Sequence, residues 1–205
     1  MVVADQTLLD VIVLAAVLVP TMLVLDKWRR KETEAEIDDM IYLIEQARIF
    51  ATEAHAAVGQ LRKYTNDPYI VHPAAVAALV ETVPHTPEMV AAAWLHDTVE
   101  DTEATLDQIR LVFGNEVAKL VWWLTDASRP TDGNRATRRA IDRAHSAKAP
   151  PQAQTIKLAD IIDNNSTIEQ HDPNFAVVWR EEKRLLLAVM TAGDPTLMKR
   201  ALEGL

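Results

Sequence analysis

Signals for helix follow one another along most of this chain, and they constrain its fold more than any other feature does. Apolar residues between Ile37 and about Val58 recur at the spacing of an amphipathic helix. Thr86, Thr105 and the Asp-Pro pairs at 172–173 and 194–195 are typical of helix starts. Only 5 of 205 residues are Gly, and no stretch alternates apolar and polar residues long enough to predict a strand. The sequence therefore predicts an all-α fold.

Proline and glycine predict further helix boundaries. Pro73 suits the first position of a helix that runs to about Val83. Gly114 should end the helix that Thr105 begins, and another helix should continue to about Ala127. The turn-rich stretch "SRPTDGN" predicts a loop, and a basic stretch follows it before helix continues after Pro150-Pro151.

The first 33 residues differ from the rest, so we divide the chain into a hydrophobic N-terminal segment, 1–33, and a folded domain, 34–205. An apolar run at residues 8–25 is followed by the basic stretch "DKWRRK". A membrane span needs about 20 apolar residues, so two readings stay open. The run could anchor the chain to the inner face of the membrane, with the domain in the cytoplasm. It could equally be a buried helix, or one through which the chain forms a homo-oligomer.

Charge and composition exclude several kinds of function. A formal net charge of −9 argues against nucleic acid or an anionic surface as a partner bound through overall charge. The absence of cysteine excludes disulfides, thiolate nucleophiles and Cys-ligated zinc. An anionic substrate would require a local metal ion or a local cluster of Arg and Lys.

The stretch "AAAWLHDTVEDT", residues 91–102, concentrates charge at the end of an apolar run. Asp97, Glu100 and Asp101 fall on neighbouring faces of a helix, where like charges repel. A bound cation is the simplest reason for such an arrangement. His96 and Asp97 could contribute two ligands, and the remaining ligands must come from other segments, because one helix cannot surround an ion.

Two other segments offer suitable ligands. His72 lies in the loop "PYIVHP", and Asp160 lies in the otherwise apolar helix "KLADIID". Either residue alone is more often structural. Together with His96 and Asp97 they form a His₂Asp₂ set, which suits a divalent ion such as Mn²⁺ and leaves positions for water and substrate oxygens.

Three motifs in this order, "GQLRKY…PYIVHP", "AAAWLHDTVEDT" and "IKLADIIDNNSTI", resemble the hydrolase domain of the RelA/SpoT superfamily. The resemblance covers roughly Ile37 to Leu187 and is to a small alarmone hydrolase with the HD-domain helical fold. It implies Mn²⁺-dependent removal of the 3′-pyrophosphate from (p)ppGpp, which releases GDP or GTP and pyrophosphate.

The resemblance also implies roles for individual residues. The metal ligands would be His72, His96, Asp97 and Asp160, and the pair that activates water would be Glu100 and Asp101. The substrate-binding residues would be Arg62, Lys63, Asn164 and Thr167. Lys157, one turn before Asp160, could equally form an ion pair with that carboxylate.

The chain departs from the family at two places. The loop "RKYTNDPYIVHP" lacks the glycine usual there, and His55 lies five residues before Gln60 instead of two or three. We therefore give His55 no site role and expect it on the helix surface or in the core. Two other functions stay open: hydrolysis of another phosphorylated nucleotide such as NADPH, and alarmone sensing without catalysis.

Overall fold

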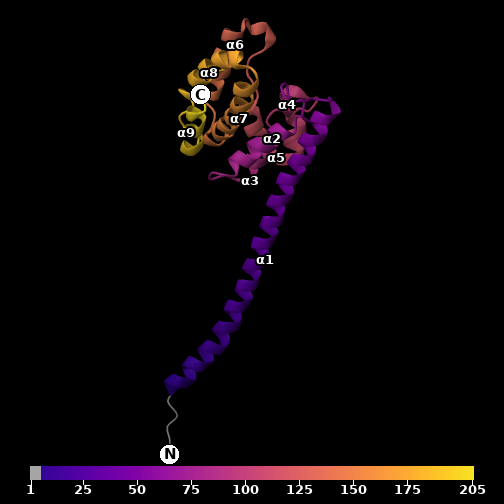
Figure 1. Cartoon of the computed structure of the whole chain (residues 1–205). Helices are drawn as coiled ribbons and strands as arrows, with labels where there is room; N and C mark the ends of the chain where they lie inside the picture. The colour runs from indigo at the N-terminus through magenta and orange to yellow at the C-terminus, as the bar shows by residue number, and fades with distance from the viewer. Residues whose placement is uncertain (1–5) are drawn as a thin grey trace, which may run out of the picture. The chain divides into compact units, whose positions relative to one another are not determined.

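The computed structural model describes the backbone of residues 6–205 and the side chains of Arg29, Lys31 and residues 33–205 (Figure 1). Over these residues there is no strand, only an isolated β-bridge between Leu61 and Pro68. The all-α prediction is confirmed. The helices are α1 (Gln6–Ala57), α2 (Val71–Val80), α3 (Pro87–Leu95), α4 (Thr98–Asp101), α5 (Leu106–Leu124), the 3₁₀ turn η1 (Pro130–Asp132), α6 (Arg135–Ser146), α7 (Pro151–His171), α8 (Pro173–Leu187) and α9 (Pro195–Glu203).

The chain divides into two compact units, residues 1–42 and 43–205, and α1 contributes to both. The sequence suggested a separate helix from Ile37 to about Val58, but the structure has one continuous helix through this region. The stretch "KETEAEIDDM" contains no Gly or Pro that would interrupt it. Both readings of residues 8–25 depend on side chains outside the described residues. Among the helices whose residues are described, none is long and apolar enough to cross a membrane.

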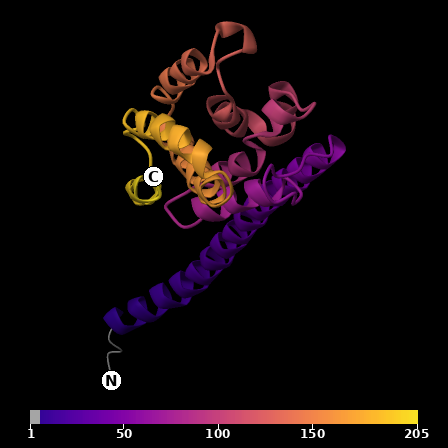
Figure 2. The same ribbon diagram turned by 45° about the horizontal axis from the view of Figure 1, so that its top comes forward.

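Within residues 43–205, α7 is the central helix (Figures 1 and 2). It packs against α2, α3 and α5 as well as against α8 and α9, and α6 packs against α8. Ile156, Leu158 and Ile161 of α7 are fully buried. Full burial of such side chains contributes about 1.5–3 kcal/mol each. Ala91, Ala92 and Ala93 of α3 are also fully buried, and because their side chains are small, that helix can approach its neighbours closely.

The predicted caps are present at the helix starts. Thr105 and Gln108 form a reciprocal capping box, with N···O distances of 3.2 Å and 2.9 Å. Thr86 caps α3, Asp172 caps α8 and Asp194 caps α9. These side chains accept hydrogen bonds from backbone N–H groups that the first turn of a helix leaves free.

Three helix boundaries differ from the prediction, and one agrees with it. α2 begins at Val71, so Pro73 is its third residue, and it ends at Val80. Proline is tolerated there because N–H groups in the first turn have no partner within the helix. The glycine boundary is confirmed: Gly114 has φ 85° and ψ 174° and interrupts α5. The second half of α5 ends at Leu124, before the expected Ala127.

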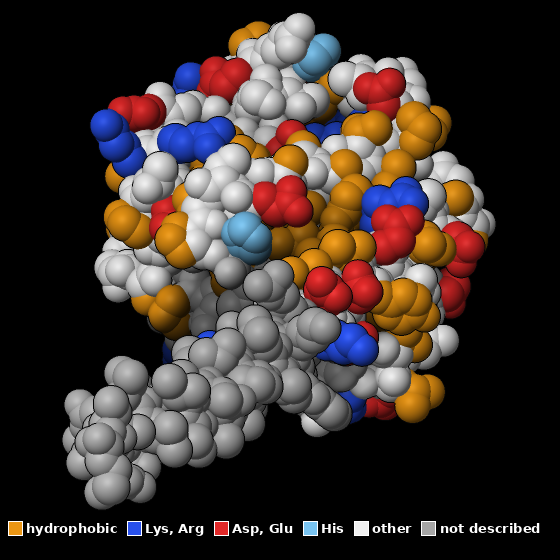
Figure 3. All heavy atoms as spheres, turned by 90° about the horizontal axis from the view of Figure 1, so that it is seen from below, with side chains coloured by type: hydrophobic (Ala, Val, Ile, Leu, Met, Phe, Trp, Pro, Cys, Tyr) orange, Lys and Arg blue, Asp and Glu red, His pale blue; other side chains and the backbone are white. Residues whose placement is uncertain are grey.

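Charges of both signs are interspersed with hydrophobic side chains on the face shown in Figure 3. On this face, overall charge does not define a site. The candidate site has to be found in a local arrangement of side chains.

Candidate metal centre

Three parts of the fold bring His72, His96, Asp97 and Asp160 together. His72 is the second residue of α2, His96 and Asp97 lie between α3 and α4, and Asp160 is in the middle of α7. His72 Nε2 is 3.5 Å from Asp97 Oδ2 and 3.3 Å from Asp160 Oδ1. His96 Nε2 is 3.0 Å from Asp97 Oδ2. One potential ligand atom from each of His72, His96 and Asp97 lies within 4.8 Å of the others.

The backbone bends at the His-Asp pair, which corrects the expectation that one helix carries the whole charged stretch. α3 ends at Leu95, and Asp97 has φ −97° and ψ −6° before the single turn of α4 begins. Thr98 is fully buried, and its hydroxyl donates to the carbonyl of Leu95 at 2.7 Å. The bend lets adjacent side chains face a common point, which neighbours in a regular helix do poorly.

Both histidines are oriented through Nδ1. His72 Nδ1 is 2.6 Å from Asp163 Oδ2, and His96 Nδ1 is 2.8 Å from the carbonyl oxygen of Ala93. With Nδ1–H as donor, each Nε2 carries a lone pair, and both Nε2 atoms are buried without a hydrogen-bond partner among the described residues. Metal-bound histidines typically have this arrangement. The residues therefore fit a divalent cation.

The carboxylates near the centre are held ionised. Burial opposes ionisation of Asp160, but the ammonium of Lys157 and then His72 outweigh it and keep its pKa well below the usual range. Lys157 Nζ is 3.2 Å from Asp160 Oδ2, the ion pair that its spacing indicated. Burial likewise opposes charge on His72, but the neighbouring carboxylates of Asp160 and Asp163 raise its pKa to about 9. These carboxylates thus attract positive charge strongly, whether it is carried by a proton or by a metal ion.

Glu100 and Asp101 lie in α4, next to the bend. The carboxylate of Glu100 accepts a hydrogen bond from the backbone N–H of Asp126. Desolvation raises the pKa of Glu100 to about 7; Lys157 opposes this rise and the charge of Asp126 adds to it. Asp101 Oδ2 accepts a hydrogen bond of 2.9 Å from Gln60 Nε2.

Four polar residues near the centre were not predicted as part of a site. Tyr69 donates its hydroxyl hydrogen to Asp97 Oδ2 at 2.6 Å, and Asp163 holds His72. Gln60 Oε1 is 2.6 Å from Nδ1 of His55, which is buried in the core. Asp163, one helical turn after Asp160, could have been found from its spacing, whereas Tyr69, Gln60 and His55 depend on how distant segments fold.

The predicted substrate-binding residues line one cavity of about 300 Å³, between the loop before α2 and helices α7 and α8. Arg62 Nη1 donates to Asn164 Oδ1 at 3.2 Å, and Asn164 Nδ2 donates to Asp160 Oδ1 at 2.6 Å. Lys63 and Thr167 also line this cavity. One hydrogen-bonded series therefore connects the cavity to the candidate ligand Asp160.

The loop that borders this cavity turns without the glycine usual in the family. Asn66 has φ 60°, in the left-handed region that asparagine enters more readily than most residues. Its N–H donates to the carbonyl of Arg62 at 3.0 Å. Asn66 thus provides the turn and keeps Arg62 and Lys63 beside the cavity.

Comparison with known proteins identifies a family and several relatives. A model of the HD domain family matches residues 47–189. A probable guanosine-3′,5′-bis(diphosphate) 3′-pyrophosphohydrolase of Synechocystis sp. is 34% identical over 154 residues, which are 73% of this chain and 20% of that protein. The guanosine-3′,5′-bis(diphosphate) 3′-pyrophosphohydrolase of Aquifex aeolicus is 34% identical over 148 residues, 72% of this chain and 20% of that protein.

A solved structure extends the comparison to the fold. It is described as a metazoan ortholog of SpoT that hydrolyzes ppGpp. Its TM-score is 0.70 at 25% identity, over 79% of this chain and 93% of that one. The chain spans about a fifth of the length of the curated relatives it matches. The resemblance to RelA/SpoT proteins is confirmed, and, with the family model matching residues 47–189, this chain belongs to the HD domain family.

Proposed function

We propose that this protein is a metal-dependent hydrolase that removes the 3′-pyrophosphate from (p)ppGpp and releases GDP or GTP and pyrophosphate. One observation carries the proposal: among the residues whose side chains are described, the buried Nε2 atoms of His72 and His96 have no hydrogen-bond partner, and they lie 3.3 Å and 3.0 Å from oxygens of Asp160 and Asp97. The names of the Synechocystis and Aquifex relatives, and the description of the metazoan structure, support this substrate.

The metal ion would be held by His72, His96, Asp97 and Asp160. Two imidazole nitrogens and two carboxylates suit a borderline-to-hard divalent ion, and we propose Mn²⁺. Such an ion would polarise a phosphoryl oxygen and lower the pKa of a bound water. Asp163 and the carbonyl of Ala93 would fix the tautomer of the two histidines, and Tyr69 would hold Asp97 in place.

Glu100 and Asp101 would accept the proton of the attacking water. Hydrolysis places the hydroxyl of water on the phosphorus attached to the 3′ oxygen, breaks that P–O bond and leaves a proton on the ribose oxygen. A general base works best when its pKa is near the working pH, and the pKa of Glu100 is raised to about 7. Gln60 would keep Asp101 turned toward the site, because its amide N–H donates to that carboxylate.

The nucleoside would occupy the cavity of about 300 Å³ beside Arg62. This volume is at the lower end of the range for small-molecule sites. Arg62 and Lys63 would meet phosphate oxygens or stack on the guanine, and Asn164 and Thr167 would contact the nucleotide. Arg62 is already oriented by Asn164 and Asp163, so little order would have to be gained on binding.

Product analysis tests this function. The full-length chain is incubated with ppGpp and Mn²⁺, and the products are separated by anion exchange. We expect GDP and pyrophosphate in equal amounts, loss of both with Asp97→Ala, and retention with Asp107→Ala, which removes an exposed carboxylate on α5. If ppGpp is bound but unchanged, the result would favour the hypothesis of alarmone sensing without catalysis. Phosphate release from NADPH with ppGpp unchanged would favour another nucleotide as substrate.

A further inference from the structure

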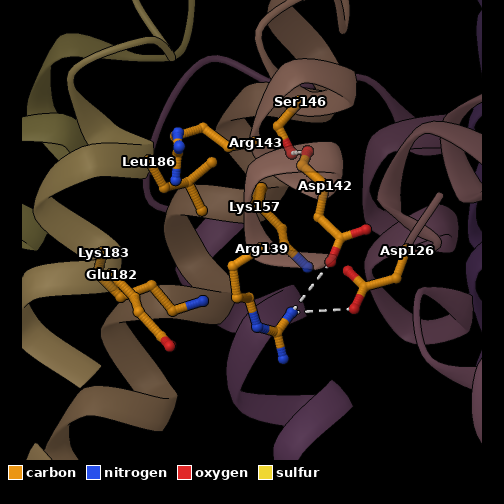
Figure 4. Close-up of a pocket in the computed structure, with 9 residues that line it drawn as sticks. All are labelled: Asp126, Arg139, Asp142, Arg143, Ser146, Lys157, Glu182, Lys183 and Leu186. Carbon is orange, nitrogen blue, oxygen red and sulfur yellow. Dashed lines mark hydrogen bonds and ion pairs between the residues drawn. The ribbon is translucent and has the colours of Figure 1, made fainter. Parts of the chain in front are cut away.

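A second, smaller cavity lies between α6, α7 and α8, and its volume is about 40 Å³ (Figure 4). Its cationic lining comes from Arg139 and Arg143 of α6, Lys157 of α7 and Lys183 of α8. The basic stretch "RATRRAIDRAH" thus contributes two arginines to it. In Figure 4 the nitrogen ends of Arg139, Lys157 and Lys183 turn toward the same space.

The acidic residues near this cavity do not neutralise all of its cations. Arg139 Nη1 is 3.0 Å from Asp126 and 3.4 Å from Asp142, and Lys157 pairs with Asp160. Glu182, which also lines the cavity, is engaged by Arg135 at 2.7 Å. Over the part of the chain with described side chains, Arg143 and Lys183 form no ion pair within 4.0 Å.

Of these two cations, Lys183 gives the stronger indication of an anion site, because it is buried. Lys183 is 9% exposed, and its Nζ lies 4.1 Å from the centroid of the Trp179 ring. Burial lowers its pKa to about 8, and the charge of Lys157 contributes to the drop. A buried ammonium without a carboxylate or other anion is costly, so a bound anion would relieve the cost.

One face of α7 carries a residue of this cavity, a candidate metal ligand and a residue of the nucleoside cavity. Lys157, Asp160 and Asn164 follow at intervals of three and four residues, which puts them on the same side of the helix. At about 1.5 Å per residue, Lys157 lies about 4.5 Å before Asp160 along the axis, and Asn164 about 6 Å after it. The small cavity, lined by Lys157, and the nucleoside cavity, lined by Asn164, therefore lie on opposite sides of Asp160 along α7.

We propose that this small cavity binds the terminal phosphate of the substrate's 3′-diphosphate, and hence also inorganic pyrophosphate, through Lys183 with Arg143. The assignment rests on the proposed function, in which the nucleoside lies beside Arg62 and the scissile phosphorus at the metal ligands. The diphosphate then extends toward Lys157. A volume of about 40 Å³ admits the oxygens of one phosphoryl group, since one water-sized probe occupies about 10–15 Å³, and it excludes a nucleoside.

Equilibrium binding of radiolabelled pyrophosphate to the full-length chain tests the assignment, with Mn²⁺ and separately with a chelator. A hydrogen bond to a charged group contributes about 1.5–3 kcal/mol, so Lys183→Gln should weaken binding about 10- to 100-fold. Lys183→Arg should retain most of the affinity. Lys119→Gln removes an exposed lysine of α5 and should change nothing. Arg143→Gln, at a half-buried position, should weaken binding even if the Lys183 variant folds poorly.

The assignment and the proposed function can fail separately. Pyrophosphate affinity unchanged in both Lys183→Gln and Arg143→Gln would overturn the assignment, even if ppGpp is hydrolysed. Loss of pyrophosphate binding in Arg62→Ala alone would place the anion in the nucleoside cavity and would also overturn it. Binding that depends on Lys183 in a protein that leaves ppGpp intact would support the cavity as an anion site and contradict the proposed reaction.

Discussion

Asp163 should matter for metal binding although it is not a proposed ligand. Its carboxylate is 2.6 Å from Nδ1 of His72, a ring that is 1% exposed, so solvent cannot replace the contact. Such a bond to a charged group contributes about 1.5–3 kcal/mol. Asp163→Ala should therefore weaken Mn²⁺ binding by about 10- to 100-fold, in line with the usual effect of removing the partner of a ligating histidine. Asp163→Asn keeps an acceptor oxygen without the charge, so its Mn²⁺ affinity should lie between that of Asp163→Ala and that of the wild type.

Two controls separate this effect from others. Asp163 also lies 3.4 Å from Arg62, so a loss could arise through the nucleoside cavity. Arg62→Ala removes that contact and leaves His72 untouched, and it should keep normal Mn²⁺ affinity. Glu116→Ala removes an exposed carboxylate of α5 and controls for net charge. Calorimetric titration with Mn²⁺ measures all four variants. Unchanged Mn²⁺ affinity in Asp163→Ala would refute the view that His72 binds metal through Nε2.

Four further predictions follow from named groups. Glu100→Gln should keep Mn²⁺ and ppGpp binding but lower the single-turnover rate by about 10²–10⁴-fold, and near-normal turnover would exclude Glu100 as the base. Because a base must be deprotonated, and the pKa of Glu100 is about 7, kcat should fall as pH decreases through a midpoint near or below 7; a midpoint above 8 would contradict this. Arg62→Ala should mainly raise KM, and a pure loss of kcat would move Arg62 into the chemical step. Thr105→Ala should lower the free energy of unfolding by about 1 kcal/mol in urea titration, and no change would mean that the capping box contributes nothing.

The sequence was most informative where a structure depends on neighbouring residues. The caps at Thr105, Asp172 and Asp194 satisfy N–H groups within three residues, so their signals lie in the local sequence. The break at Gly114 is similarly local, because a φ of 85° suits glycine and few other residues. The all-α fold followed from many such signals that agreed with one another.

The grouping of His72, His96, Asp97 and Asp160 was predicted because their residue types suit one ion, but other features that depend on distant contacts were not predicted. The bend at His96 and Asp97 has no glycine or proline to mark it, and it exists where α3 and α7 pack and Thr98 is buried. Gln60 reaches Asp101 across 41 positions, and Tyr69 reaches Asp97 across 28. Lys183 looks like an ordinary surface lysine in the sequence. Only the packing of α8 shows that it is buried.

The division of the chain at residue 33 stays a prediction. If residues 34–205 are sufficient for catalysis, a chain that begins at Glu34 should keep the ppGpp hydrolysis rate of the full-length chain within about twofold. An inactive but folded product would show that the preceding segment contributes to the site. Circular dichroism would establish that the shortened chain is folded.

The location of the metal ion tests the central claim most directly. Crystals of the protein grown with Mn²⁺ can be measured at the manganese absorption edge, where anomalous scattering locates the ion independently of its surroundings. We predict a single strong peak bonded to Nε2 of His72 and His96 and to carboxylate oxygens of Asp97 and Asp160. A peak bonded to other side chains, or no peak at these four residues in crystals that contain Mn²⁺, would contradict the proposed metal centre.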